Sequence, residues 1–228
     1  MSEKILELKD AVLAYNKDYC ALNYVNVAFS KGEKVAVVGG YGSGKTSFLR
    51  VFAGLEKLKS GECLINGREV AKVDFAHDIS LGFLSSMPIF FEKRTVFDNL
   101  SWALKVRGVE KEKRAELVNQ VLVECEISSL ADKKAKQLTP VERRIVQIAR
   151  LMLRPLDVLL CDELFDVFEA EARKTIDKVF SKLLSKPNSD KVVIFACENA
   201  EPYKNYVDKV YTMELGDIKE EEKSDAKL

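Results

Sequence analysis

A glycine-rich run constrains this chain more than any other feature of its sequence. It follows an apolar stretch, residues 34–38, and precedes a helix-like stretch, residues 46–53. Strand, glycine loop and helix are the context in which the pattern G-x-x-x-x-G-K-[ST] cradles phosphate groups. The run therefore predicts a nucleotide site, and the residues expected to bind there are Gly39, Gly40, Tyr41, Gly42, Ser43, Gly44, Lys45, Thr46 and Ser47.

The residue types in this loop suit a triphosphate. Glycines let backbone N–H groups approach the phosphates closely and adopt dihedral angles that other residues avoid. Lys45 is expected to reach the β- and γ-phosphates, and the Thr46 hydroxyl is expected to take a place on Mg²⁺. The alternative is a glycine-rich turn that only resembles a phosphate loop.

A second pair of residues points to the same chemistry. Asp162 and Glu163 follow a fully apolar stretch, residues 158–161, so they should lie at the carboxyl end of a buried strand, where open α/β sheets bind ligands. Asp162 is expected to hold Mg²⁺ through its water shell, and Glu163 to orient or deprotonate an attacking water. The alternative is a pair of acids that cap a strand at the surface.

Composition sets the outer bounds. The 228 residues, 47% of them hydrophobic, are enough for one large domain or one domain with an inserted lobe. Basic and acidic residues both number 36, and without a basic stripe we expect no nucleic-acid partner. The five scattered cysteines suit reduced, buried positions, and no stretch reaches the roughly 18 apolar residues of a membrane span. We therefore expect a soluble, cytoplasmic chain.

Periodicity along the chain predicts an α/β alternation with a helical lobe inserted between strands. Strands are expected at residues 5–15, 24–30, 34–38, 79–84, 158–163, 192–196 and 207–213, with a hairpin at 62–70 turning at Asn66 and Gly67. Helices are expected at residues 46–53, 95–104, 113–126, 141–153 and 169–184. Residues 216–228 are rich in charge and are expected to be disordered.

The order of these parts resembles the nucleotide-binding subunit of an ATP-binding cassette (ABC) transporter from Ile5 to about Lys219. The matching stretches are residues 31–34, 42–46, 95–100 and 154–163, and residues 104–109 are most similar to importer subunits. The resemblance implies an α/β P-loop NTPase core with an antiparallel β subdomain and an inserted α-helical subdomain at about 86–153. The cassette would span residues 1–218 and leave a charged tail at 219–228.

The same resemblance implies ligands and partners. ATP and Mg²⁺ would be the cofactors, with adenine stacked on Tyr15. A second nucleotide-binding subunit, identical or different, would face this one head to tail. A transmembrane permease subunit would dock through about residues 86–91, with Trp102 nearby, and would hold the chain on the cytoplasmic face of the membrane. Ordinary core packing is the alternative for these aromatic residues.

Several positions depart from the family's pattern. The signature Leu-Ser-Gly-Gly-Gln is replaced at residues 138–142 by Leu-Thr-Pro-Val-Glu, in which Pro140 has no N–H to donate and Glu142 adds negative charge. Ser86 stands where the family has glutamine, and Glu198 stands where it has a switch histidine. His77 lies far from that position and is expected to be a surface or structural residue. The loop after the catalytic acid, residues 164–169, differs as well.

The matches and departures together favour ATP binding over rapid turnover. With Glu163 and Lys45 as catalytic residues, we expect slow or regulatory ATP hydrolysis, because losing positioned groups lowers rate more than affinity. Glu198 either points to solvent or acts as a substitute switch. The alternative function is a non-transport module that uses ATP as a structural or sensing ligand. A nucleic-acid-associated ATPase is disfavoured because the sequence shows neither a basic face nor long arms.

Overall fold

A computed structural model describes residues 3–16, 19–75, 77–185 and 190–221. The chain forms two compact units. The first comprises Met1–Ser86, Asp157–Asp166 and Asp190–Leu228, and the second comprises Met87–Leu156 and Val167–Ser189. No helix among the described residues is long and apolar enough to cross a membrane.

An antiparallel sheet forms one layer of the first unit. Its strand order is β2-β1-β4-β5, with bounds Cys20–Ser30, Lys4–Ala14, Ser60–Ile65 and Arg68–Glu69. Strands β4 and β5 are joined by a tight turn in which Asn66 and Gly67 have φ values of 49° and 74°. Asparagine and glycine tolerate positive φ, so the predicted hairpin is confirmed.

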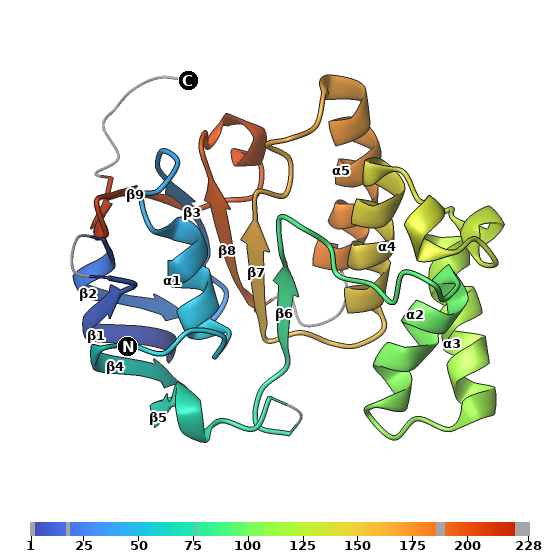
Figure 1. Ribbon diagram of the computed structural model, residues 1–228, viewed down its shortest axis with the longest axis horizontal. Helices are drawn as coiled ribbons and strands as arrows, with labels where there is room; N and C mark the ends of the chain where they lie inside the picture. The colour runs from blue at the N-terminus through green and yellow to red at the C-terminus, as the bar shows by residue number, and fades with distance from the viewer. Residues whose placement is uncertain (1–2, 17–18, 76, 186–189, 222–228) are drawn as a thin grey trace. The chain divides into compact units, whose positions relative to one another are not determined.

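A mostly parallel sheet forms a second layer of this unit (Figure 1). Its order is β10-β9-β3-β8-β7-β6, with bounds Asp217–Glu220, Lys209–Glu214, Lys34–Val38, Val192–Cys197, Val158–Asp162 and Leu81–Leu84. Strands β7 and β8 are buried along their whole length, as their unbroken apolar sequences require. Because β3, β8 and β7 run parallel, their carboxyl ends meet at one edge of the sheet.

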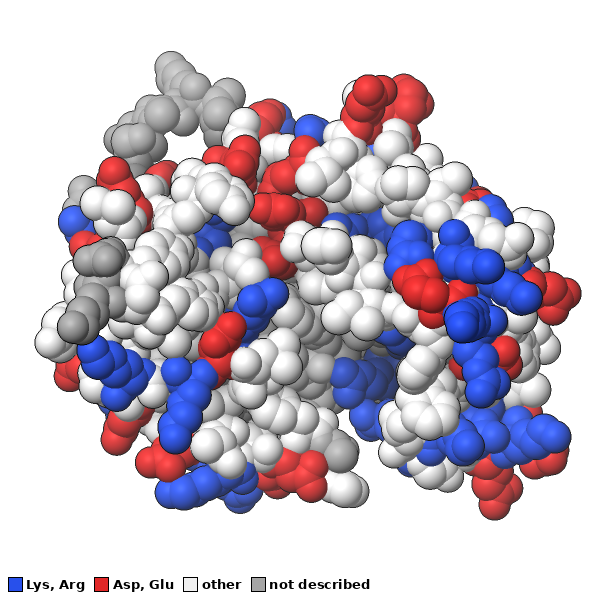
Figure 2. Space-filling view, in the orientation of Figure 1, with Lys and Arg blue, Asp and Glu red and all other residues white. Residues whose placement is uncertain are grey.

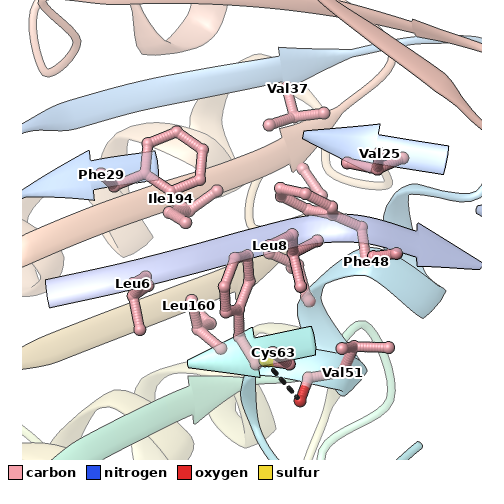
Figure 3. Close-up of a cluster of buried hydrophobic side chains, with 14 of the residues drawn as sticks. Leu6, Leu8, Val25, Phe29, Val37, Phe48, Val51, Cys63, Leu160 and Ile194 are labelled. Carbon is pink, nitrogen blue, oxygen red and sulfur yellow. Dashed lines mark hydrogen bonds between the residues drawn. The ribbon is translucent and has the colours of Figure 1, made fainter. Parts of the chain in front are cut away.

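Helix α1, Lys45–Phe52, packs between the two sheets and contacts strands of both. Its apolar side chains enter a core formed with residues of β1, β2, β3, β7 and β8 (Figure 3). The rings of Phe29, Phe48 and Phe52 meet edge to face, with centroids 5.1 to 6.2 Å apart. This core holds the start of α1 against the end of β3, so the glycine-rich loop is anchored on both sides.

The second unit is helical. It contains α2, Val96–Lys105; α3, Lys111–Glu124; α4, Pro140–Met152; and α5, Ala170–Ser185, with short 3₁₀ turns at Ser128–Leu130 and Ala135–Gln137. Helix α2 packs against α3 and α4, and α4 packs against α5. Helix α2 begins with a capping box, in which Thr95 accepts from the backbone N–H of Asp98 and Asp98 accepts in return.

The predicted α/β class is confirmed, while element bounds differ from the expectation in several places. Strand β2 begins at Cys20 rather than at residue 24. Helix α5 groups with the helical unit. Residues 217–220, expected to be disordered, form β10, while 222–228 lie outside the described residues. An edge strand needs few apolar residues because one face and one edge meet water, so the single half-buried Ile218 is enough to seat it on β9.

Candidate nucleotide site

The glycine-rich loop joins β3 to α1 as predicted. It is tied to the sheet by Gly39, whose N–H donates to the carbonyl of Cys197 at 3.2 Å. Gly44 precedes α1 with φ of 108°, and a Cβ there would lie 2.1 Å from the carbonyl oxygen of Ala21. Only glycine fits that position.

The Lys45 side chain lies inside the loop and is only 6% exposed. Its ammonium donates to the carbonyl oxygens of Gly39 and Gly40 at 2.7 and 2.9 Å and to Ser43 Oγ at 3.3 Å. The first N–H groups of α1 have no acceptor within their own helix and carry its partial positive charge. The loop therefore combines a fixed cation with backbone donors, which is the chemistry of an anion site.

Thr46 and Asp162 lie together although 116 residues separate them. The Thr46 hydroxyl, in the first turn of α1, donates to the two carboxylate oxygens of Asp162 at 3.0 and 3.2 Å. Asp162 ends β7 and is 2% exposed. A hydroxyl beside a carboxylate supplies the hard oxygen ligands that Mg²⁺ prefers, so the residues present fit a triphosphate with its metal ion.

Glu163 follows Asp162 in a left-handed conformation, with φ of 50°, and its backbone N–H donates to the carbonyl of Ala196 at 2.9 Å. This turn lifts Glu163 out of the strand, where it is half-buried, at the same sheet edge as Asp162. Glu198 follows β8 directly and is exposed. Glu163 and Glu198 therefore follow the neighbouring strands β7 and β8.

Asp166, which no sequence motif marks, is a third acid at this edge. Burial, reinforced by the carboxylates of Glu163 and Glu198, raises the pKa of Asp166 from 3.8 to about 6. Its Oδ1 accepts weakly from the hydroxyl of Tyr203 at 3.4 Å, whereas its Oδ2 is buried without a hydrogen-bond partner among the described residues. The carboxyl group is thus poised to keep a proton well above the usual pH range of an aspartate.

Tyr203 braces the segment that follows Glu163. It is fully buried, and its hydroxyl accepts from the backbone N–H of Phe165 at 3.1 Å. Its ring packs against Phe165 and Phe195, with centroids 5.2 and 5.0 Å away. Thirty-eight residues separate Tyr203 from Phe165, so no local pattern reveals this contact.

Two tyrosines stand beside the loop. Tyr15, singled out in the sequence, follows β1 and shares a hydrogen bond with Ser47 Oγ at 2.9 Å. Tyr19 was not singled out; it donates to the carbonyl of Gly42 at 3.0 Å, and its ring stacks on that of Tyr15. The sequence signal that could have pointed to Tyr19 is its place as a second aromatic residue four positions after Tyr15. Tyr41 is fully exposed at the loop's tip, on a cavity of about 350 Å³ between residues 39–43 and 212–215.

In the helical unit, Thr139 caps helix α4, which begins at Pro140. Thr139 and Glu142 form a capping box: the Glu142 backbone N–H donates to Thr139 Oγ1 at 3.3 Å, and the Glu142 carboxylate accepts from the Thr139 N–H at 2.7 Å. Pro140 takes the first helical position, where its missing N–H costs nothing. Lys133 pairs with Glu142 at 2.9 Å, so the negative charge expected at this position is compensated within the chain.

The segment after Ser86 displays apolar side chains. Met87 and Ile89 are exposed, whereas Phe90 is buried between the guanidinium groups of Arg143 and Arg150, each 5.1 Å from the ring centroid. The same two arginines donate to backbone carbonyls of the segment, those of Pro88 and Ile89. Two arginines of α4 therefore fix the backbone of residues 88–90.

Phe91 and Trp102 lie edge to face with centroids 5.4 Å apart and are about half exposed. They line a cavity of about 320 Å³ with Arg94, Asp98, Ser101 and Lys105. Buried Asn99 fixes the segment by bonding both the N–H and the carbonyl of Phe91, at 2.8 and 3.2 Å.

The cysteines and the single histidine have the expected surroundings. The five cysteines are free thiols, four of them buried and Cys20 half-buried. Burial raises the pKa of Cys63 to about 12, so this thiol stays protonated. His77 is exposed and its Nδ1 lies 2.8 Å from a carboxylate oxygen of Asp74, as expected for a surface residue.

A comparison with protein families decides the assignment. The family described as ABC transporter matches residues 22–166, which is more than half of the chain. The chain belongs to the ABC transporter family. Members of this family bind ATP with Mg²⁺, which agrees with the fit of the loop, Thr46 and Asp162.

Curated members of the ABC transporter family resemble the chain over most of its length. The sulfate/thiosulfate import ATP-binding protein CysA of Pseudomonas putida is 29% identical over 219 residues, which cover 94% of this chain and 65% of the relative. CysA of Pectobacterium atrosepticum is 31% identical over 88% of this chain and 61% of its own length. The chain thus spans less than two thirds of these relatives.

Solved ABC cassettes share the fold. The chain matches the dimeric post-hydrolysis structure of the cassette MJ0796 bound to ADP and Pi with a TM-score of 0.83, at 21% identity, over 96% of this chain and 98% of that one. It matches the ADP conformation of the cassette MJ1267 with a TM-score of 0.73, at 21% identity, over 95% and 89%. The two sheets and the helices therefore follow the cassette architecture.

Proposed function

We propose that this chain is the ATP-binding subunit of an importer-type ABC transporter, which binds Mg-ATP and couples its binding to a membrane permease. The observation that carries the proposal is the bond between Thr46 and Asp162, 3.0 Å long, beside a loop whose lysine is already turned inward. It brings together, from distant parts of the sequence, two residues that would hold the metal ion of a bound triphosphate. The import ATP-binding names of the curated relatives support the same role.

Each site residue has a distinct task in this proposal. Lys45 leaves the carbonyls of its own loop for the β- and γ-phosphates, and the backbone of residues 39–47 cradles the phosphates. Thr46 and Asp162 hold Mg²⁺, which when bound neutralises charge on the phosphates. Tyr15 carries the adenine ring.

Hydrolysis, where it occurs, depends on Glu163. Its half-buried carboxylate, at the edge where β7 ends, suits a group that orients or deprotonates a water. The exposed Glu198 replaces the family's switch histidine, and residues 138–142 form a helix cap in place of the signature. Positioned charge supplies most of the rate in phosphoryl transfer, so we propose slow or regulatory turnover.

The permease docks, in this proposal, on the segment Ser86–Phe91 and on Trp102. Support comes from the exposed side chains of Met87 and Ile89 and from the aromatic cavity beside them. Basic side chains, drawn blue, gather over α2 and α3 of the helical unit (Figure 2). They suit a partner helix with an apolar face and acidic flanks. In this proposal the chain lies at the cytoplasmic face of a membrane. It also pairs with a second nucleotide-binding subunit.

Two measurements test the proposal. The first is calorimetric titration with Mg-ATP of the parent chain, Lys45→Ala and Asp162→Asn, with Lys219→Ala, an exposed lysine of β10, as the control. We expect Lys45→Ala and Asp162→Asn to weaken binding at least tenfold and Lys219→Ala to leave it unchanged. Equal affinities in all four proteins would contradict the assignment of Lys45 and Asp162 to the Mg-ATP site.

The second measurement is co-purification from detergent-extracted membranes of the native cells in Mg-ATP. We expect a permease to remain bound to the parent chain and to be lost from a Met87→Asp, Ile89→Asp double variant. Both positions are exposed, so the substitutions leave the core untouched. Recovery of soluble proteins alone would overturn the transporter role and favour an ATP-sensing module.

A further inference from the structure

The turn after β7 holds Glu163 in a backbone conformation that needs support from outside the turn. Its φ is 50°, in the left-handed region. Residues with a Cβ avoid this region and keep to it only where the surrounding structure fixes the backbone. Two hydrogen bonds supply that support: the N–H of Glu163 donates to the carbonyl of Ala196 in β8 at 2.9 Å, and the N–H of Phe165 donates to the hydroxyl of Tyr203 at 3.1 Å. One backbone group and one side chain therefore fix this turn.

The Tyr203 side chain is itself fixed by its surroundings. It is fully buried, and its ring lies between 5.0 and 5.2 Å from the ring centroids of Phe195 and Phe165. The residue ends a short 3₁₀ turn, Glu201–Tyr203, whose backbone is closed by a bond from the Tyr203 N–H to the carbonyl of Ala200 at 2.8 Å. A ring packed on two others has little freedom to move, so the hydroxyl keeps its place beside the turn.

The hydroxyl of Tyr203 contacts two consecutive residues of the turn. It accepts from the N–H of Phe165, and it donates to Oδ1 of Asp166 at 3.4 Å. Burial, reinforced by the carboxylate of Asp166, raises the pKa of Tyr203, so the hydroxyl stays protonated and can keep donating. Removing this one oxygen atom would therefore take two contacts from the backbone and side chains that follow Glu163.

We infer that Tyr203 is a positioning residue for ATP hydrolysis, which holds the turn at residues 163–166 so that the Glu163 carboxylate stays aligned with the attacking water. The inference rests on the proposed function, in which Glu163 orients or deprotonates that water. Thr46 and Asp162 lie in α1 and β7 and make no contact with the hydroxyl, so binding of Mg-ATP does not require it. A catalytic group displaced by about 1 Å can cost on the order of a hundredfold in rate, so a small movement of this turn is enough to slow hydrolysis.

A purely structural role for Tyr203 makes a different prediction. If Tyr203 only stabilised the fold, Tyr203→Phe would lower the free energy of unfolding and leave the rate of the folded protein unchanged. If Tyr203 acts through Glu163, its hydroxyl should stop mattering once the Glu163 carboxylate has been removed. Comparing Tyr203→Phe in the parent and in a Glu163→Gln background therefore separates the two roles.

The experiment measures phosphate release at saturating Mg-ATP and, by calorimetric titration, the affinity for Mg-ATP, on the full chain. The variants are Tyr203→Phe, Glu163→Gln and the two combined. Tyr211→Phe is the matched control, because Tyr211 is a buried tyrosine of β9 whose hydroxyl also donates to a carboxylate, that of Glu220 at 3.1 Å. Hydrogen exchange of the Phe165 N–H reports whether the bond to residue 203 is lost. Circular dichroism and the thermal midpoint check that each variant folds.

We expect Tyr203→Phe to lower turnover about tenfold, to change the affinity for Mg-ATP less than about twofold and to speed exchange of the Phe165 N–H, while Tyr211→Phe matches the parent. In the Glu163→Gln background, Tyr203→Phe should change the remaining rate less than about twofold. Unchanged turnover, unchanged exchange, or an equal loss of rate in both backgrounds would overturn the inference and leave the ATP site intact. A parent chain that binds Mg-ATP without hydrolysing it would overturn the inference alone, whereas a parent chain that does not bind Mg-ATP would overturn the proposed function as well.

Discussion

Replacing Asp166 with asparagine tests the electrostatics of the acidic sheet edge. Burial, together with the charges of Glu163 and Glu198, raises the pKa of Asp166 to about 6. The folded chain therefore holds this proton more tightly than the unfolded chain, whose carboxyl titrates near 3.8. Between about pH 4 and 6 folding takes up a proton, so the free energy of unfolding falls as pH rises through this window and is level above it.

The size of the effect follows from the two pKa values. A difference of this size corresponds to about 3 kcal/mol for a fully buried group. Asp166 is half-buried, and solvent screens its neighbours, so we expect about 1 to 2 kcal/mol. Asparagine keeps the shape and can accept from Tyr203 but carries no charge. Asp166→Asn should therefore match the parent near pH 4 and be more stable by this amount at pH 7.5.

The assay is urea unfolding followed by circular dichroism at pH 4, 6 and 7.5, in EDTA and without nucleotide. Asp217→Asn, which changes an exposed carboxylate on β10, is the control and should show no growth of stability with pH relative to the parent. A difference between Asp166→Asn and the parent that is the same at every pH would refute the electrostatic account. It would point instead to packing or hydrogen bonding of the amide.

Three further predictions concern other parts of the molecule. Thr139→Ala removes the α4 cap and should lower the urea-unfolding free energy by about 1 kcal/mol, with exposed Thr175→Ala as control; no loss would contradict a stabilising cap. Asn99→Ala should cost about 2 to 3 kcal/mol in the same assay and speed proteolysis near Phe91, because it removes the two hydrogen bonds between the Asn99 side chain and the Phe91 backbone; unchanged cleavage would contradict this role of Asn99. Glu198→His should raise ATP turnover in a phosphate-release assay if a missing switch limits the rate, and Glu163→Gln should abolish that gain.

Local patterns located the glycine loop and the acidic end of β7, which the structure brings together. The glycine loop, Lys45 and Thr46 form one contiguous motif, and β3 was predicted with its observed bounds, Lys34–Val38, because the apolar run that follows Lys34 ends at Gly39. Asp162 was recognised because two acids follow a strand too apolar to lie anywhere but the sheet interior. In each case the deciding residues are neighbours in sequence.

Residues whose role depends on distant partners were not predicted. Tyr19 meets Gly42 across 23 residues, and Tyr203 meets Phe165 across 38. Neither contact has a spacing rule, because loop closure brings the partners together only in the folded chain. The capping box at Thr139 and Glu142 did have a local signal, Thr-x-x-Glu, but it coincides with the signature position and was interpreted only as a departure from it.

Because the N-terminus of α4 is capped within the chain, this chain would contribute fewer hydrogen-bond donors to a facing cassette than a subunit with an uncapped helix would. Thr139 and Glu142 bond each other, and Pro140 has no N–H, so this helix start offers few donors to a neighbour's phosphates. Beside a partner with an open helix start, one composite site would be well supplied with donors and the other poorly supplied. Such a pair would be asymmetric, because its two composite sites would meet their phosphates with different sets of backbone donors.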